Sequence, residues 1–190
     1  MAIIVVGGGG RGAGKTALVC GLMRALPQIP WTAVKITTHE HGKPTPIWEE
    51  TEPGEGSDTA RYLAAGARRS LLVTAGATGS DDEALGPIVQ QVLRECLPPD
   101  KALQSGVIFE SNSVLRHLRP DVCLCAATGP WVREKPSYDL LSQRMDAMVE
   151  LAGHDHIIEA EKITFRLASM ERVSPTMLEW LLERLGDRLP

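Results

Sequence analysis

The stretch Gly-Gly-Arg-Gly-Ala-Gly-Lys-Thr, residues 9–16, decides the fold of this 190-residue chain. It follows the β-branched run Ala2–Val6 and precedes a helical apolar pattern over residues 14–26, which Pro27 ends. A short β-branched run predicts a buried parallel strand, so the glycines lie between a strand and a helix. The stretch fits GxxxxGK[ST] in full, and in that context it predicts a loop that holds phosphate groups.

The parts of this phosphate-binding loop have separate chemical tasks. Glycines let backbone N–H groups turn toward phosphate oxygens, and the helix that begins near Gly14 points its positive end at the anion. We expect Lys15 to reach the β- and γ-phosphates of a nucleotide and the Thr16 hydroxyl to bind Mg²⁺. Arg11 has two interpretations: a solvated loop residue, which we favour, or a cation for a phosphate in the same chain or across a dimer. The remaining expected nucleotide contacts are Gly9, Gly10, Gly12, Ala13 and Ala17.

Strand and helix signals alternate along almost all of the sequence. Besides the first pair, strands are expected at residues 31–36, 69–75, 106–110, 121–126, 156–158 and 163–167, and helices at 57–65, 81–96, 111–118, 138–151 and 174–185. The long polar stretch 37–56 is expected to be a loop. Such alternation predicts an α/β fold of the P-loop NTPase type, with three layers and helices on both faces of a mainly parallel sheet. Because no linker or internal repeat divides the chain, residues 1–190 are expected to form a single nucleotide-binding domain.

Composition narrows the range of partners. The chain has 20 Lys and Arg residues against 24 Asp and Glu residues, for a net charge of −4. That balance argues against a nucleic acid or an anionic membrane held by bulk charge. No secretory leader is recognisable and no apolar run approaches the ~20 residues that span a bilayer, so we expect a cytoplasmic protein without a membrane partner. The four cysteines form no CxxC pair and are expected to be reduced core residues.

Two acids compete for the magnesium ion and for a part in catalysis. Glu110 ends the apolar run that begins at Gly106, and a carboxylate at the carboxyl end of a buried strand faces the ligand crevice of an open α/β sheet. Asp58 lies near a helix start after the long loop, where charge complementarity with the helix dipole explains it equally well. Both stay candidates, as catalytic residues together with Lys15 and as metal ligands together with Thr16.

Two histidine pairs have a spacing that places side chains on one side of an extended chain. They are His39 with His41 and His154 with His156. A metal site needs further ligands, and none follows at a convincing spacing. Solvated loop histidines are therefore the simpler interpretation, and metal binding by these pairs stays open.

The identity of the base also stays open. The guanine-specific Asn-Lys-x-Asp pattern is absent. Lys135, in the loop expected over residues 128–137, could stack its aliphatic stem on either purine. The nucleotide is therefore expected to be GTP or ATP.

Three groups of residues follow one another over about the first 75 residues. They are Val5-Val6-Gly7 with Gly14-Lys15-Thr16, then Val34-Lys35-Ile36 before a histidine, then Gly56-Ser57-Asp58-Thr59-Ala60-Arg61 with Ala65-Gly66-Ala67. In order and spacing these groups resemble the accessory proteins of molybdopterin-guanine dinucleotide biosynthesis, the MobB-like family. The segment from Asp58 to Ala67 is the specific part of the resemblance, and Ser57 departs from the lysine of the family's segment.

This resemblance implies a P-loop protein that binds GTP, hydrolyses it slowly, forms a dimer and assists the attachment of a nucleotide to molybdopterin. It also implies that Lys35, Asp58 and Glu110 border the nucleotide. Together with the phosphate-binding loop, it favours a Mg²⁺-dependent purine nucleoside triphosphatase that works with a molybdenum-cofactor biosynthesis protein. Two alternatives stay open: a nucleotide-switched module that binds a partner, for example in metal insertion, and a P-loop kinase of a small molecule.

Overall fold

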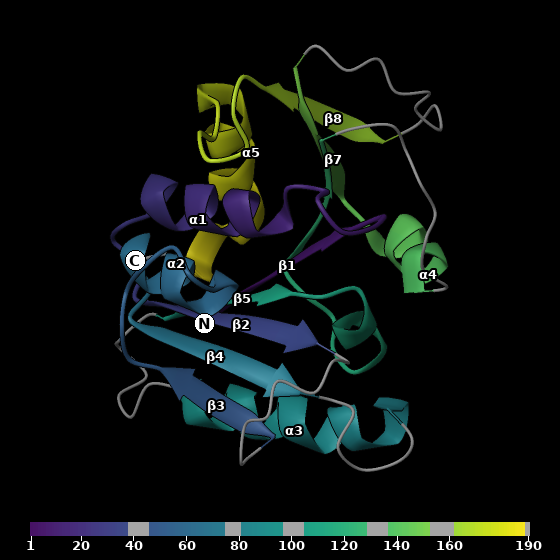
Figure 1. The fold of residues 1–190 in the computed structure, drawn as a ribbon. Coiled ribbons are helices and arrows are strands. Elements are labelled where there is room, and N and C mark those ends of the chain that lie inside the picture. Colours follow the sequence, from purple (N-terminus) through teal and green to yellow (C-terminus); the bar gives the residue numbers. More distant parts are fainter. Residues whose placement is uncertain (38–45, 75–80, 97–104, 129–136, 153–161, 189–190) are drawn as a thin grey trace.

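The computed structural model describes residues 1–37, 46–74, 81–96, 105–128, 137–152 and 162–188 (Figure 1). Its strands are β1 (Ala2–Gly8), β2 (Trp31–Thr37), β3 (Ile47–Glu50), β4 (Arg69–Thr74), β5 (Gly106–Glu110), β6 (Val122–Ala127), β7 (Ala147–Leu151) and β8 (Ile163–Leu167). Its α-helices are α1 (Lys15–Ala25), α2 (Asp58–Ala64), α3 (Asp81–Cys96), α4 (Ser137–Arg144) and α5 (Pro175–Leu185). Two 3₁₀ turns, η1 (Ser113–Arg116) and η2 (Gly186–Arg188), complete the described elements.

The described strands form a sheet in the order β3-β4-β2-β5-β1-β6-β7-β8 (Figure 1). Neighbouring strands are parallel, except that β3 runs antiparallel to β4 at one edge. Because β1 lies between β5 and β6, the loop that follows it lies at the middle of the sheet's carboxyl edge. In open α/β sheets, ligands bind in the crevice outside this edge. The predicted α/β architecture of the P-loop NTPase type is confirmed.

Two apolar cores cover the two faces of the sheet, because successive side chains of a strand point to opposite sides. In β1, Ile4 and Val6 join the core that α1 and α5 cover, whereas Val5 joins the core that α3 and α4 cover. The helices contribute Leu18, Leu22, Leu181 and Leu185 to the first core and Leu85, Val89, Val92 and Leu141 to the second. Burial on both faces explains why the central strands are continuous apolar runs without polar alternation.

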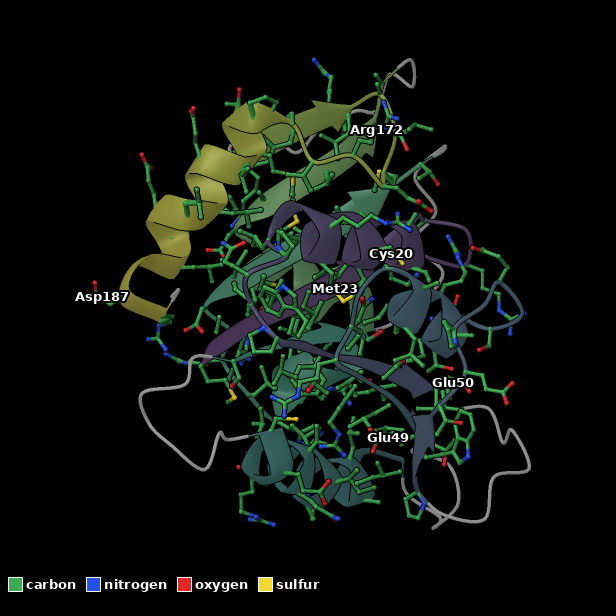
Figure 2. All side chains as sticks on the ribbon, turned by 90° about the vertical axis from the view of Figure 1, so that its left-hand side faces the viewer. Cys20, Met23, Glu49, Glu50, Arg172 and Asp187 are labelled. Carbon is green, nitrogen blue, oxygen red and sulfur yellow. The ribbon has the colours of Figure 1, made fainter. Side chains whose placement is uncertain are left out.

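Charged side chains are visible at the periphery, around the two apolar cores (Figure 2). Figure 2 shows Cys20 and Met23 of α1 in the interior, and Arg172 at the periphery, where it is exposed. The edge strand β3 carries Glu49, whose carboxylate accepts hydrogen bonds from Arg69 of β4 at 2.8 and 2.9 Å. Charged side chains on an edge strand discourage pairing with a strand of another molecule.

Local signals place several helix ends as the sequence predicts. The Ser57 hydroxyl accepts the Ala60 N–H at 3.0 Å and caps α2. The Ser174 hydroxyl accepts the Met177 N–H at 3.3 Å and caps α5, with proline at the first helical position. Such caps satisfy backbone donors that have no partner inside the helix, and a proline in the first turn loses no hydrogen bond.

The helix expected over residues 138–151 is wrong in its second half. α4 ends at Arg144, and the rest of the stretch forms β7. Its apolar residues fit a helical period, but they also form a short run that suits a strand buried between β6 and β8. Asp146 marks the change: its backbone N–H donates to the Cys123 carbonyl and its carboxylate accepts the Cys123 N–H, both at 2.8 Å. Pairing with β6 therefore overrides the helical period.

Two smaller expectations also need correction. The stretch 37–56 contains β3, which pairs with β4 and so is held by a neighbour that local sequence does not reveal. The short helix expected over residues 111–118 is the 3₁₀ turn η1. The strand candidate at residues 156–158 lies outside the described residues.

The cysteines are free and buried, as expected. Burial raises the pKa of Cys20 to about 11 and the pKa values of Cys123 and Cys125 to about 12. Burial disfavours the thiolate because a charge is costly in an apolar interior, so these thiols stay protonated.

None of the helices in the described part of the chain combines the length and apolar composition that crossing a bilayer requires.

Two adjacent leucines of α5 test the assignment of its buried face. Leu181 is fully buried, whereas Leu182 is 39% exposed. We expect Leu181→Ala to lower the free energy of unfolding by about 2–5 kcal/mol, because it leaves a cavity in the core under α5. Leu182→Ala, the matched control, should change it by less than about 0.5–1 kcal/mol. Urea denaturation of both variants measures the difference, and equal losses would contradict the assignment.

Candidate functional site

The predicted phosphate-binding loop joins the carboxyl end of β1 to the start of α1. Gly14 is the residue before α1 and has a φ of 84°, and Gly12 has a φ of 72°. L-residues with a side chain rarely adopt this left-handed conformation. At Gly14 space is also limiting, because an added Cβ would lie 2.4 Å from the Thr128 Cγ2 atom and 3.0 Å from the Met170 Cγ atom. The loop therefore needs glycine here for both conformation and space.

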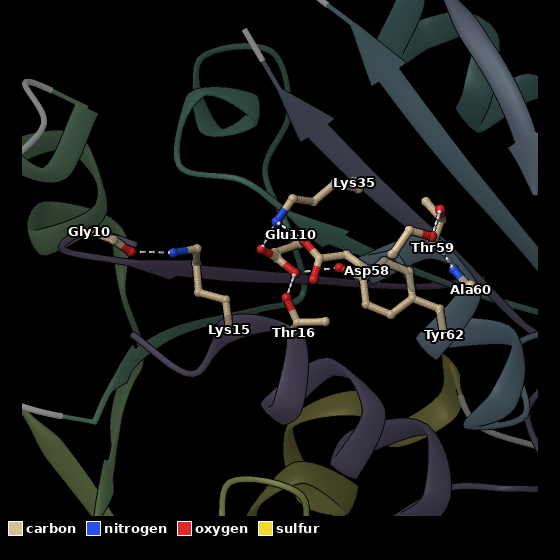
Figure 3. A network of polar contacts seen from close by, with 10 residues as sticks. Gly10, Lys15, Thr16, Lys35, Asp58, Thr59, Ala60, Tyr62 and Glu110 are labelled. Atoms are coloured by element: carbon tan, nitrogen blue, oxygen red, sulfur yellow. Dashed lines mark hydrogen bonds and ion pairs between the residues drawn. The ribbon is translucent and has the colours of Figure 1, made fainter. Parts of the chain in front are cut away.

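Lys15 folds back over this loop (Figure 3). Its ammonium donates to the Gly10 carbonyl at 2.6 Å, and Figure 3 shows it pointing away from the neighbouring Thr16. The first turn of α1 has no acidic residue, and the Gly14 position provides no side-chain cap. A helix start of this kind, next to an ammonium group, is electrostatically suited to an anion.

Asn112 fixes the beginning of the loop. Its side-chain amide exchanges two hydrogen bonds with the backbone of Gly8: the Gly8 N–H donates to Oδ1 at 2.9 Å, and Nδ2 donates to the Gly8 carbonyl at 3.0 Å. The approach is close enough that a Cβ at Gly7 would lie 2.5 Å from the Asn112 Oδ1 atom. On the far side of the loop, the Thr128 hydroxyl donates to the Gly12 carbonyl. The loop is thus fastened to the segments that follow β5 and β6.

Beside the loop, three side-chain donors converge on Glu110 (Figure 3). Glu110 is the last residue of β5, is only 2% exposed, and pairs in register with Lys35 of β2. Its Oε2 atom accepts the Thr16 hydroxyl at 2.7 Å and also the Tyr62 hydroxyl, while its Oε1 atom accepts the Lys35 ammonium. The Lys35 ammonium also lies 2.9 Å from the Asp58 Oδ2 atom. Lys35 therefore bridges two carboxylates.

The charges of this cluster stabilise one another. Burial would by itself lower the pKa of Lys35, but Glu110 and then Asp58 raise it, and the net pKa lies above its usual value. Burial would likewise raise the pKa of Asp58, but Lys35, together with Thr16 and Arg61, outweighs that effect and the net pKa is lowered. For Tyr62, burial and then the Glu110 charge hold the pKa well above its usual value, so its hydroxyl stays protonated. The cluster thus holds ionised Asp58 and Lys35 beside a neutral phenol.

The oxygen donors here fit a magnesium ion. Mg²⁺ prefers oxygen ligands and is usually held by one or two carboxylates, with waters and substrate phosphates filling the other positions. Glu110, Asp58 and the Thr16 hydroxyl form such a donor set close to the phosphate-binding loop. Among the described residues, no group of three or more His, Cys, Asp or Glu side chains has an arrangement that could hold a metal by itself.

The structure brings together most of the residues singled out from the sequence. Gly9, Gly10, Arg11, Gly12 and Ala13 lie in the loop, Lys15, Thr16 and Ala17 start α1, Lys35 lies in β2, Asp58 begins α2, and Glu110 ends β5. The two histidine pairs and Lys135 lie outside the described residues.

Sequence reasoning missed two members of the site, Asn112 and Tyr62. Asn112 follows the end of β5 by two positions, so its place just after a predicted buried strand was a usable signal. Tyr62 lies four residues after Asp58 and so on the same face of α2. That spacing was a signal as well, but only once Asp58 was known to face the site.

Comparisons with known proteins support the fold. No protein-family model matches this chain, and no curated protein matches it. Among solved structures, LpxK from Aquifex aeolicus, crystallised in complex with ATP, is similar with a TM-score of 0.53 and 19% sequence identity. The alignment covers 87% of this chain and 53% of that one, so this chain spans about half the length of LpxK. At this identity the likeness shows the fold, and the resemblance to MobB-like proteins stays a prediction.

The two positive-φ glycines of the loop offer a matched test of its geometry. We expect both Gly12→Ala and Gly14→Ala to destabilise the protein by about 1–2 kcal/mol through backbone strain. Gly14→Ala should lower the free energy of unfolding clearly more than Gly12→Ala. The reason is that its Cβ meets Thr128 and Met170, whereas a Cβ at Gly12 meets nothing within 4 Å. Chemical denaturation compares them, and a Gly12→Ala loss as large as that of Gly14→Ala would show that the loop differs from this structure.

Proposed function

We propose that this chain binds a purine nucleoside triphosphate, GTP or ATP, together with Mg²⁺, and hydrolyses it slowly. The observation that carries this proposal is the hydrogen bond between Thr16, in the phosphate-binding loop, and Glu110, a buried carboxylate on the adjacent strand. It joins a phosphate-binding element to a metal-binding element in a single site. That LpxK, which shares the fold, was crystallised with ATP is consistent with a nucleotide as the ligand.

The triphosphate would be held by the loop and by Lys15. Backbone N–H groups of residues 9–16 and the start of α1 would supply donors, and Lys15 would supply a cation. Its contact with the Gly10 carbonyl is local, so the ammonium can exchange this carbonyl for a more strongly attractive phosphate oxygen. Lys35 offers a second ammonium on the far side of the same site.

The metal would be held by Thr16, Glu110 and Asp58. When bound, Mg²⁺ neutralises phosphate charge and polarises the phosphoryl group. Phosphoryl transfer to water depends mainly on positioning and on charge stabilisation, so Lys15, Glu110 and Asp58 are the residues we propose for catalysis. The two carboxylates are already oriented toward one point because Lys35 contacts both.

The resemblance to MobB-like proteins supplies the proposed context: a GTP-binding, homodimeric, cytoplasmic accessory protein of molybdenum-cofactor biosynthesis. The segment that carries the resemblance takes part in the site, since Ser57 caps α2 and Asp58, the next residue, contacts Lys35. This placement supports a functional origin for that sequence pattern. This support for the resemblance does not depend on whether the bound purine is guanine or adenine.

Loss of the loop lysine tests the nucleotide site. Lys15→Ala should weaken binding of the preferred triphosphate at least about 100-fold, because a phosphate loses a charge-assisted hydrogen bond. Lys162→Ala is the control, since that lysine contacts the Met145 carbonyl at the opposite end of the strands. Calorimetry with ATP, GTP and their diphosphates, with and without Mg²⁺, measures both variants and the preferred base. Unchanged affinity in Lys15→Ala, with the fold intact, would refute the loop's role.

Removal of the buried charge tests the metal site. Glu110→Gln should retain nucleotide binding but lower Mg²⁺-dependent phosphate release at least about 10-fold, because the amide is a poor magnesium ligand. Glu179→Gln, on the exposed side of α5, is the control. If Glu110→Gln hydrolyses nucleotide normally, Asp58 or another acid holds the metal.

The reaction products distinguish the alternatives. Slow release of inorganic phosphate to water supports the proposed hydrolase. Tight nucleotide binding without turnover would instead indicate a nucleotide-switched partner-binding module, and transfer of phosphate to a cell metabolite would indicate a small-molecule kinase.

A further inference from the structure

Tyr62 is the member of the cluster to which the proposed function assigns no task. It lies on α2, its side chain is fully buried, and its hydroxyl donates to Glu110 (Figure 3). A buried tyrosine hydroxyl needs a hydrogen-bond partner, but a backbone carbonyl would serve that need. Here the partner is instead the Glu110 carboxylate, at the end of β5.

The hydrogen bonds of Glu110 divide its two oxygens unequally. Oε2 accepts two hydroxyl donors, from Thr16 and from Tyr62, whereas Oε1 accepts the ammonium of Lys35. Because a carboxylate oxygen has about two acceptor positions, Oε2 is fully used and Oε1 keeps spare capacity. Oε1 is also the oxygen that faces Asp58, since both contact the same ammonium. The second carboxylate therefore lies on the side of the oxygen with spare capacity.

The geometry of α2 explains how one helix can arrange this. Asp58 and Tyr62 are separated by four residues, so they lie on the same face of the helix, one turn apart. Tyr62 ties that face to β5 through Glu110, and Asp58 meets Lys35 of β2 from the same face. The phenol thus links the placement of one carboxylate to the orientation of the other.

We propose that Tyr62 is a positioning residue, which holds the Glu110 carboxylate so that Oε1 is turned toward Asp58 and available to the metal. The proposal rests on the function proposed above. Tyr62 acts through Glu110 and touches neither the nucleotide nor the metal. Without its hydroxyl, Oε2 would gain a free acceptor position and the carboxylate could rotate about its last bond, so that the metal would meet a less ordered ligand.

Tyr62→Phe tests the proposal because it removes the hydroxyl and keeps the buried ring. We expect metal-free nucleotide affinity to stay within about 2-fold of the wild type, since no loop contact changes. The Mn²⁺ affinity of the complex with a non-hydrolysable triphosphate, measured by electron paramagnetic resonance, should fall about 10-fold. In turnover, the Mg²⁺ concentration for half-maximal activity should rise, with KM for the nucleotide nearly unchanged.

Tyr138→Phe is the matched control. Tyr138 is the other tyrosine of the chain, is also buried, and lies in α4 on the opposite face of the sheet. The Tyr138→Phe substitution should leave the Mn²⁺ affinity of the protein–nucleotide complex unchanged. If Tyr62→Phe loses stability but binds Mn²⁺ as the wild type does, the tyrosine is merely structural and the inference is wrong. If the wild type itself binds no metal–nucleotide complex, the proposed function fails and this inference fails with it.

A second measurement needs no substitution at Tyr62. Two tyrosines give two ¹⁹F resonances when the chain is labelled with 3-fluorotyrosine, and Tyr138→Phe assigns them. Adding Mg²⁺ to the protein–nucleotide complex should shift the Tyr62 resonance and leave that of Tyr138 in place. A Tyr62 resonance that does not respond to the metal would overturn the proposal.

Discussion

The pairing of Lys35 with Glu110 on neighbouring strands is the interaction on which the rest of the site depends. The two residues are in register across β2 and β5, and Glu110 has almost no exposed surface. A buried carboxylate is tolerable only when opposite charge and hydrogen bonds compensate for the loss of water. That requirement explains why Thr16 and Tyr62 also donate to it, from two helices that are distant in sequence.

Around this charge pair, separate segments restrain the predicted phosphate-binding loop on both sides. Asn112 holds Gly8 from the segment after β5, and Thr128 contacts the Gly12 carbonyl from the end of β6. Because β5 and β6 flank β1, these contacts fix the loop to the middle of the sheet. Rigid backing of this kind suits the proposed anion site, whose donors would have to be aligned before the anion binds.

Sequence patterns predict the parts of this molecule that depend on near neighbours. The bounds of α3, the serine caps of α2 and α5, and the strand–loop–helix unit around the glycines agree with the structure because short-range signals determine them. β7 was predicted as the second half of a helix, and β3 as loop, because in both places pairing with a distant strand decides the conformation. The same reasoning explains the site. Glu110 could be singled out by its position at a strand end, whereas the contribution of Tyr62 depends on how α2 lies against β5.

The buried cysteines of the folded chain react slowly with thiol reagents, and this low reactivity is useful in experiments. Cys20 lies in α1, with its thiol near the Arg61 carbonyl of α2, while Cys123 and Cys125 lie inside β6. Because only a thiolate reacts readily, alkylating reagents reach these atoms when the surrounding layers separate. The modification rate of Cys20 therefore measures local opening between α1 and α2, and the rates of Cys123 and Cys125 measure opening of the sheet. A single cysteine introduced on the surface would, for the same reason, carry a dye with little background.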